Sequence, residues 1–373
     1  MTAASLREAQ RIVIKIGSQL LVDPASGTVN KSWLATLADD VGMLRAQGKD
    51  VVVVSSGAIA VGRRHLGLPN GDLKLQEQQA AAATGMVRLA HAYQDVLDQH
   101  DLTVSMVLLT LDDSENRRRY INARNTLIEL LDLGAVPLIN ENDTVATDEI
   151  RFGDNDRLAA RVAAMVSADL LVVLSDIDGL YTANPQIDPG AEFIPEVHGE
   201  ISAEIEGMPG VNLSGDSKGG MVTKLAAAKI AMGAGAKAII ALGTEPHPLK
   251  RILDGARATL FVPNATPRSA RKEWIAGSLS PSGRIIVDAG ALNALKDGKS
   301  LLPAGVRGIQ GTFERGDAVS VVDPDGREIA RGLVAYPFND AAKIAGHKTS
   351  EIEDTLGYRG RDEMIHRDDL VLL

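Results

Sequence analysis

Short apolar runs alternate with longer amphipathic stretches along roughly the first 260 residues of the chain. The apolar runs predict buried strands, and the stretches with apolar residues three or four apart predict helices. We expect strands at residues 11–17, 50–54, 103–109, 135–139, 170–174 and 236–241. We expect helices over residues 30–48, over 75–99 with a break or easing near Gly85, over 117–133, and up to Ala234. Strands that alternate with helices predict an α/β fold with a covered parallel sheet.

The pattern changes after about residue 263, where prolines and glycines separate short apolar runs. These runs lie at residues 284–287, 305–309, 318–322 and 328–335, and they predict a small β-rich domain. We therefore divide the chain into a first domain (1–263), a linker (264–280) and a second domain (281–373). Residues 281–373 carry 12 basic and 15 acidic side chains, a net charge of −3.

Polar residues follow the strand expected at 135–139 and gather over the next twenty positions. The first group spans residues 140–144 (NENDT), and the second spans 153–156 (GDND), where Asp154 or Asn155 can cap the following helix. Ligands of open α/β sheets bind just beyond the carboxyl ends of the strands. This stretch is therefore the predicted centre of a small-molecule site.

Other strands end in small or charged residues that belong to the same edge. Lys15 lies inside the apolar run RIVIKIG, a position that favours an anionic ligand. Ser55-Ser56-Gly57-Ala58 follows the second strand, and Ser175-Asp176 follows the fifth. Residues 207–219, rich in Gly, Ser and Asn, predict a loop that leads into the run GGMVTKL at 219–225.

Composition narrows the function classes. The formal charge is −10 and aromatic residues make up 3% of the chain, whereas nucleic-acid binding favours a basic surface and stacking rings. The chain has no cysteine, its seven histidines lack metal-ligand spacing, and no apolar run reaches the ~18 residues of a membrane helix. With no signal-peptide pattern, we expect a cytoplasmic protein without a resident metal.

The candidate site pools two lysines, Lys15 and Lys224, with the acids Asp143 and Asp156. Lysines and backbone N–H groups suit phosphoryl transfer, which mainly needs positioning and charge stabilisation. The set contains no histidine or cysteine, and therefore no obvious general base. A carboxylate acceptor, with a pKa near ~4.3, is already ionised at neutral pH and needs none. The residues therefore favour an acyl phosphate as product.

Motifs in this order resemble those of the glutamate 5-kinases of the amino acid kinase family: KIGS, SSGAIAVGR, INENDTVAT, FGDNDRLAA, SDIDGLYTANP and GGMVTKL. The segments SLLPAGV, GTFERGD and IARGL resemble the PUA domain that is appended to bacterial members. The resemblance implies a three-layer α/β/α sandwich with a mainly parallel sheet and a C-terminal PUA domain. It implies transfer of the ATP γ-phosphate to the glutamate side chain, the first step of proline biosynthesis, with Mg²⁺ carried on ATP.

The resemblance also implies roles for single residues. Lys15 and Lys224 would flank the transferred phosphoryl group, and Asp156 would hold both ammonium groups. Ser56, Asp143 and Asn155 would bind glutamate, with Asp143 suited to the α-ammonium. The implied ATP contacts are Lys15, Ser175, Asp176, Lys218, Gly219, Gly220, Met221, Val222, Thr223 and Lys224. Ser175 stands where the family more often has Thr, and Lys218 stands where a small residue is commoner.

Partners and alternatives complete these expectations. The resemblance implies a homo-oligomer (dimer or tetramer), inhibition by proline in competition with glutamate, and glutamyl phosphate reductase as a candidate partner. One alternative is another amino acid kinase, acting on acetylglutamate, aspartate or carbamate. A second alternative, an RNA-binding protein that acts through the PUA domain, is disfavoured by the charge of −3 on residues 281–373.

Overall fold

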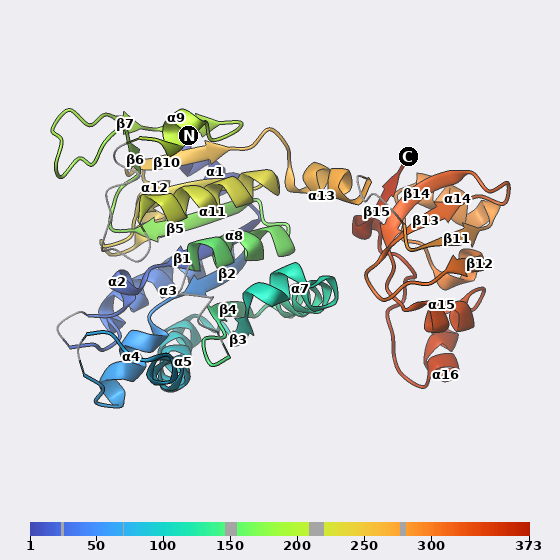
Figure 1. The fold of residues 1–373 in the computed structure, drawn as a ribbon, viewed down its shortest axis with the longest axis horizontal. Helices are drawn as coiled ribbons and strands as arrows, with labels where there is room; N and C mark the ends of the chain where they lie inside the picture. The colour runs from blue at the N-terminus through green and yellow to red at the C-terminus, as the bar shows by residue number, and fades with distance from the viewer. Residues whose placement is uncertain (24–25, 70, 146–154, 209–219, 277–280) are drawn as a thin grey trace. The chain divides into compact units, whose positions relative to one another are not determined.

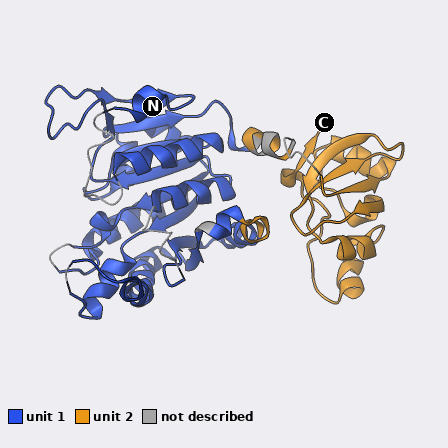
Figure 2. Ribbon diagram, viewed as in Figure 1, with its two compact units in different colours: residues 1–115, 122–267 blue, residues 116–121, 268–373 orange. Residues whose placement is uncertain are grey.

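The computed structural model describes residues 1–23, 26–69, 71–145, 155–208, 220–276 and 281–373 (Figure 1). The chain divides into two compact units (Figure 2). Unit 1 comprises residues 1–115 and 122–267, and unit 2 comprises residues 116–121 and 268–373. None of the described helices is both long and apolar enough to cross a membrane.

Unit 1 is built on an eight-stranded sheet with the order β3-β4-β2-β1-β5-β9-β10-β8. Every neighbouring pair from β3 to β9 is parallel, whereas β10 runs antiparallel to β9 and parallel to β8. The strands are β1 (Arg11–Ile16), β2 (Asp50–Ser55), β3 (Val104–Leu109), β4 (Val136–Glu141), β5 (Leu170–Ser175), β8 (Glu196–His198), β9 (Lys237–Leu242) and β10 (Ala258–Val262).

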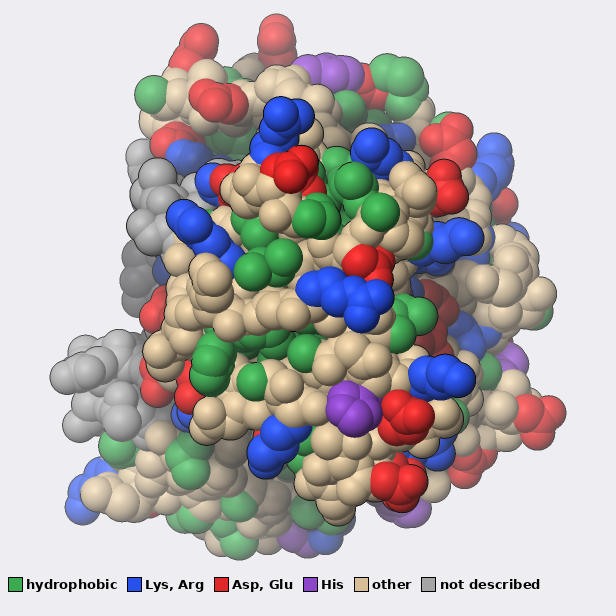
Figure 3. All heavy atoms as spheres, turned by 90° about the vertical axis from the view of Figure 1, so that its right-hand side faces the viewer, with side chains coloured by type: hydrophobic (Ala, Val, Ile, Leu, Met, Phe, Trp, Pro, Cys, Tyr) green, Lys and Arg blue, Asp and Glu red, His purple; other side chains and the backbone are tan. Residues whose placement is uncertain are grey.

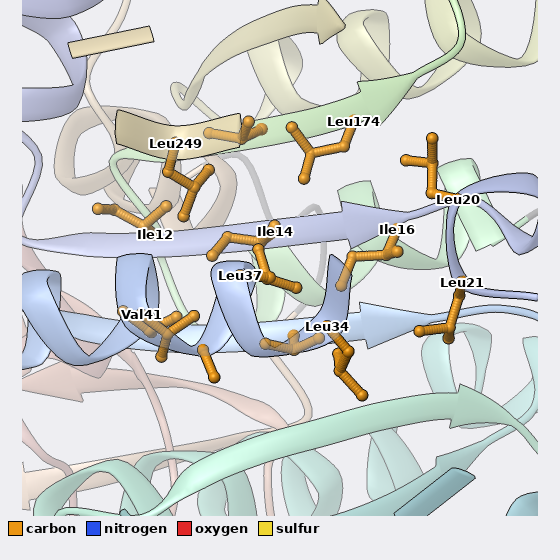
Figure 4. Packing of buried hydrophobic residues seen from close by; sticks show 14 of the residues in the cluster. Ile12, Ile14, Ile16, Leu20, Leu21, Leu34, Leu37, Val41, Leu174 and Leu249 are labelled. Carbon is orange, nitrogen blue, oxygen red and sulfur yellow. The ribbon is translucent and has the colours of Figure 1, made fainter. Parts of the chain in front are cut away.

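Helices cover both faces of this sheet. On one face, Ile12, Ile14 and Ile16 of β1 share a buried cluster with Leu34 and Leu37 of α3 (Figure 4). On the other face, α8 packs on β1 and against α11. The helices of unit 1 are α1 (Thr2–Glu8), α2 (Ser18–Leu21), α3 (Lys31–Ala46), α4 (Ala58–His65), α5 (Leu75–Leu97), α6 (Leu111–Glu115), α7 (Arg117–Asp132, shared with unit 2), α8 (Asn155–Met165), α9 (Ala203–Glu206), α11 (Met221–Gly233) and α12 (Pro248–Leu253).

The strand register brings the polar strand ends to one edge. Ile16, the last residue of β1, pairs with Ser55 at the end of β2 and with Leu174 near the end of β5. Because these strands are parallel, the residues that follow them leave the sheet on the same side. β4 continues two residues beyond the strand expected at 135–139, so Asn140 belongs to the sheet and is buried.

The helix expected to break or ease near Gly85 is continuous, so that expectation is wrong. Gly85 instead allows α5 to cross α4 at very close range. A Cβ atom at Gly85 would lie 1.7 Å from the carbonyl oxygen of Ala58, and one at Gly62 would lie 1.8 Å from that of Ala81. The glycine is present because a neighbouring backbone occupies its side-chain position, and the helical hydrogen bonds are unaffected.

Unit 2 contains a five-stranded sheet with the order β12-β11-β13-β14-β15. Only the β11–β13 pair is parallel, and the sheet has its own buried apolar cluster, which includes Ile285 and Val321. On the face drawn in Figure 3, basic and acidic side chains are interspersed. The elements are α13 (Pro267–Ala276), β11 (Gly283–Val287), α14 (Ala289–Lys296), β12 (Val306–Gly311), β13 (Ala318–Val322), β14 (Glu328–Leu333), α15 (Phe338–Ile344), α16 (Ile352–Leu356) and β15 (Leu370–Leu372).

The predicted fold class is confirmed: a mostly parallel sheet between helices, with a small β-rich C-terminal domain. Within the stretch expected as a linker, 264–280, residues Pro267–Ala276 form α13. The antiparallel strand β10 and the short hairpin of β6 (Leu180–Tyr181) and β7 (Phe193–Ile194) add to the expected elements.

Candidate active site

Lys15 is placed by the alternation of side chains along β1. Successive residues of a strand point to opposite faces, so Lys15 lies on the face opposite Ile14 and Ile16. That face is covered by α8, and the Lys15 side chain is only 11% exposed. A buried ammonium needs a partner, because removing a charge from water without compensation is costly.

Asp156, in the first turn of α8, is that partner. Its Oδ1 lies 2.6 Å from Nζ of Lys15, and its side chain is 2% exposed. Within the described part of the chain, Lys15 is the one partner of this oxygen. The other oxygen, Oδ2, accepts a hydrogen bond of 2.7 Å from Oγ1 of Thr223. The carboxylate therefore joins β1, α8 and α11.

Asn155 precedes Asp156 and reaches the end of β2. Its Nδ2 donates to the carbonyl oxygen of Ser55 and to Oγ of Ser56, both at 2.8 Å, and lies 3.3 Å from Oδ1 of Asn140. Asn155 and Asn140 are both buried. Among the described residues, Oδ1 of Asn155 and Nδ2 of Asn140 are buried without a hydrogen-bond partner, which is uncommon for polar atoms in a folded protein.

Tyr93 supports this corner from α5. It is fully buried, and its hydroxyl donates to Oγ of Ser55 at 3.1 Å. Burial raises the pKa of Tyr93 above its ordinary value, so the phenol stays neutral and remains a donor. A fixed Ser55 also fixes the carbonyl group to which Asn155 donates.

Asp143 lies just beyond β4 and is partly buried. Burial, and then the nearby charge of Glu141, raise the pKa of Asp143 to about 7. A cation placed against this carboxylate would lower its pKa again, because an opposite charge favours the ionised form. The position is therefore suited to an ammonium ligand.

The remaining predicted contacts lie at the end of β5 and the start of α11. Ser175 is buried and its Oγ lies 2.9 Å from Oδ1 of the exposed Asp176. The residues from Met221 to Lys224 form the first turn of α11, with Gly220 as its N-cap, and Lys224 is 7% exposed. The predicted contacts Lys218 and Gly219 lie outside the described residues.

The structure thus brings together Lys15 with Asp156, and Asn155 with Ser56, at one edge of the sheet. Sequence reasoning missed the contact of Thr223 with Asp156, and it also missed Tyr93 as a neighbour of the site, whereas Asn140 belongs to the polar group expected there. A Thr within the first turn of an expected helix could have indicated the first of these. Tyr93 carries no such signal, because its spacing is that of an ordinary core residue. Among the described residues, no group of three or more His, Asp or Glu side chains could hold a metal ion.

Comparison with known proteins shows which protein families the chain matches. Residues 10–241 match the model of the amino acid kinase family, and residues 283–356 match that of the PUA domain. A glutamate 5-kinase of Paramagnetospirillum magneticum is 62% identical over 367 residues, which cover 98% of this chain and 99% of that protein. A glutamate 5-kinase of Agrobacterium fabrum is 58% identical over 372 residues, covering 100% of this chain and 95% of that protein.

Among solved structures, carbamate kinase from Giardia lamblia bound to AMP-PNP covers 71% of this chain and 100% of its own, with a TM-score of 0.51 and 13% sequence identity. This likeness concerns the fold alone. The family resemblance drawn from the motifs is confirmed by the two family models and by the curated relatives. The chain is a kinase that belongs to the amino acid kinase family and carries a PUA domain after its kinase domain.

Proposed function

We propose that the chain transfers the γ-phosphoryl group of MgATP to the side-chain carboxylate of L-glutamate, giving L-glutamyl 5-phosphate and ADP. This reaction is the first step of proline biosynthesis. The proposal follows the activity named for relatives that are 57–62% identical over nearly the full chain. We expect the reaction to take place in the cytoplasm.

One observation carries the proposal: two consecutive residues of α8 serve two different groups of side chains. Asn155 donates to Ser56 and to the end of β2, where an unpartnered donor and acceptor remain. Asp156 holds the ammonium group of Lys15 and the hydroxyl of Thr223. A ligand beside Asn155 and a phosphoryl group beside Lys15 would therefore be held next to each other, as a transfer reaction requires.

The residues present suit this chemistry without a general base. The transferred phosphoryl group spreads negative charge over its oxygens, and ammonium groups already in place stabilise that charge without reorganisation. We assign this role to Lys15 and Lys224, and we assign to Asp156 the positioning of Lys15. The attacking carboxylate is already ionised, because its ordinary pKa near ~4.3 is far below neutral pH.

Glutamate would be read by Ser56, Asp143 and Asn155, with the α-ammonium against Asp143. MgATP, a substrate that brings its own metal ion, would lie over the ends of β5 and β9 and the start of α11. Ser175, Asp176 and the segment 218–224 would contact it, and backbone N–H groups at the start of α11 suit phosphate oxygens. This division places the two substrates on opposite sides of Lys15.

A panel of acceptors tests the proposal. The purified chain is incubated with MgATP, hydroxylamine and one of glutamate, N-acetylglutamate, aspartate or carbamate, and the trapped hydroxamate is measured. We expect glutamate to be preferred by a wide margin. Preference for another acceptor would assign the chain to a different branch of the family. The Lys15→Met variant is the control for trapping that does not depend on catalysis.

We also propose inhibition by proline at the glutamate site. Proline keeps the α-carboxylate and a cationic α-nitrogen but lacks the side-chain carboxylate to be phosphorylated. Inhibition should therefore compete with glutamate and leave the KM for MgATP unchanged. Glu149 lies outside the described residues, and we expect Glu149→Ala to weaken proline binding more than glutamate binding. Simultaneous binding of both amino acids in calorimetry would contradict a shared site. We further propose that the chain forms a homo-oligomer and that glutamyl phosphate reductase is a partner.

A further inference from the structure

A buried hydroxyl on β10 joins two segments that follow β5. Thr259 is the second residue of an otherwise apolar strand and is completely buried. Its Oγ1 accepts a hydrogen bond of 2.7 Å from the N–H of Leu180 and donates one of 2.6 Å to the carbonyl oxygen of Ile194. One side chain therefore holds both strands of the β6–β7 hairpin against β10.

The fit between β10 and this hairpin is close at Gly179. A Cβ atom there would lie 2.6 Å from Oγ1 of Thr259 and 2.6 Å from Cε2 of Phe193. Gly179 has a φ of +151°, a backbone conformation that other residues rarely adopt. The absent side chain allows the chain to run directly over the threonine hydroxyl, so the hydrogen bond and the glycine belong to one arrangement.

A second set of contacts holds the same segment from the surface. Arg257 lies with its guanidinium carbon 5.0 Å from the centre of the Phe193 ring and donates to the hydroxyl of Tyr181 at 3.1 Å. That hydroxyl donates to Oδ1 of Asp178 at 2.8 Å. The Tyr181 and Phe193 rings meet edge to face with centroids 5.4 Å apart. Residues 178–181 are thus fixed at both ends.

This segment begins two residues after Asp176, where the chain leaves β5. We propose that Thr259 and Arg257 are positioning residues of the nucleotide site, which set the place of Ser175 and Asp176 by fixing residues 178–181. The inference rests on the proposed function, which assigns those two residues to MgATP. It gives the antiparallel strand β10 a role in binding the phosphoryl donor, and it assigns β10 no contact with glutamate.

Thr259→Val tests the inside contact, because valine keeps the shape and removes the hydroxyl. The N–H of Leu180 then loses its partner, and we expect the KM for MgATP to rise about tenfold, the scale of one buried hydrogen bond left unmade. The KM for glutamate and kcat at saturating MgATP should stay within about twofold of the wild type. Thr259→Ser keeps the hydroxyl and should restore the KM for MgATP.

Arg257→Met tests the surface contact and should not affect folding, because the Arg257 side chain is 57% exposed. We expect about a threefold rise in the KM for MgATP from loss of the cation–π contact and the hydrogen bond to Tyr181. Lys250→Met is the matched control: Lys250 of α12 forms an exposed ion pair of 2.8 Å with Asp254, the residue that follows this helix, and the KM for MgATP should not change.

Titration with a non-hydrolysable ATP analogue gives a second readout that does not depend on the acceptor. A wild-type chain that binds the analogue but makes no glutamyl hydroxamate would contradict the proposed function, and the analogue titration would still decide the role of β10. Unchanged nucleotide affinity in Thr259→Val and Arg257→Met would overturn the inference. A parallel rise in both KM values together with a lower Tm would also overturn it, since the contacts would then be structural only. If Thr259→Val fails to fold, Arg257→Met decides.

Discussion

The hydroxyl of Thr223 donates a hydrogen bond of 2.7 Å to Oδ2 of Asp156, the carboxylate whose other oxygen pairs with Lys15. The same hydroxyl oxygen lies 2.9 Å from the carbonyl oxygen of Gly220, which caps α11. Thr223 therefore links the start of α11 to Asp156, the acid that pairs with Lys15. Although expected as an ATP contact, its described partners are Asp156 and its own helix.

Thr223→Val should lower kcat by about tenfold, because Asp156 loses one of its two partners and Lys15 loses a fixed counter-charge. Thr223→Ser keeps the hydroxyl and should retain most of the activity. The measurement is steady-state kinetics with both substrates varied. A rise in the KM for MgATP with unchanged kcat would indicate that Thr223 acts by contacting the nucleotide.

Lys15→Met should lower kcat by about 10²- to 10³-fold with little change in glutamate binding if, as proposed, its charge acts mainly on the transferred phosphoryl group. Lys224→Ala should behave similarly. Asp156→Asn should also lose catalysis, because it leaves Lys15 buried without its carboxylate partner. Asp50→Asn is the control. Asp50 pairs with Arg11 at 2.9 Å at the opposite end of the same sheet, so its loss should change stability and leave kcat unchanged.

The strands that frame the site could be predicted because they are buried on both faces. Continuous apolar runs such as VVVV at 51–54 and LLVVL at 170–174 are typical of strands that are covered on both faces. The single lysine of β1 stands out because the residues on either side of it in the run are apolar. Lys15 and Asp156 also follow from one rule, that parallel strands bring their carboxyl ends to one edge. Their pairing across 141 positions is visible only in the structure.

Other features could not be predicted because they depend on contacts between distant segments. Gly85 has a low helix propensity, which favours a break in α5. The helix is nevertheless continuous, and the glycine serves the close contact with the backbone of Ala58 in α4. The strand β10 is short and follows a helix of only six residues, so its antiparallel pairing with β9 has no sequence signal. In the sequence Thr259 is indistinguishable from an ordinary β-branched strand residue. Its hydrogen bonds to Leu180 and Ile194 become visible only in the structure.

Asp143 predicts a pH dependence of glutamate binding. Its pKa of about 7 means that the carboxyl is mostly protonated in mildly acidic solution, and a protonated carboxyl does not attract an ammonium group. The KM for glutamate should therefore rise by about tenfold for each pH unit below 7 and level off above it. Asp143→Asn should bind glutamate weakly at every pH and lose this dependence. A wild-type KM that stays flat between pH 6 and 8 would contradict the role.

The raised pKa of Asp143 also predicts that folding stability depends on pH. Stability should fall as the pH rises, whereas glutamate binding should improve. The folded-state pKa of Asp143 lies above the ordinary value of 3.8, so its contribution to folding stability is present below that value and is lost as pH rises through about 7. Asp143→Asn should therefore gain stability relative to the wild type over this range, as measured by urea unfolding. Loss of glutamate binding with gained stability above pH 7 would separate function from folding.

The crossing of α4 and α5 predicts a strong effect of one methyl group. Gly85→Ala would place a Cβ atom 1.7 Å from a backbone oxygen of α4, so we expect a loss of about 3 kcal/mol or more in the free energy of unfolding. Gly233→Ala is the matched control, since nothing lies within 4 Å of its Cβ position at the end of α11. That change should be neutral or stabilising by up to about 1 kcal/mol. Similar urea midpoints for the two variants would show that the helices can separate at little cost.

The two separate apolar clusters lead to a prediction about the C-terminal unit. One cluster surrounds β1 and α3, and another lies within residues 285–370, so each unit has its own core and should fold alone. A chain ending at Pro267 should stay soluble, unfold in one cooperative transition and form glutamyl hydroxamate with kcat within about threefold of the full chain. Residues 281–373, expressed separately, should give the circular dichroism of a β-rich domain. If the shortened chain is folded but inactive, the PUA domain would be required to complete the enzyme or its oligomer. If it is insoluble, residues 116–121, which group with unit 2, would be the first place to look for the missing support.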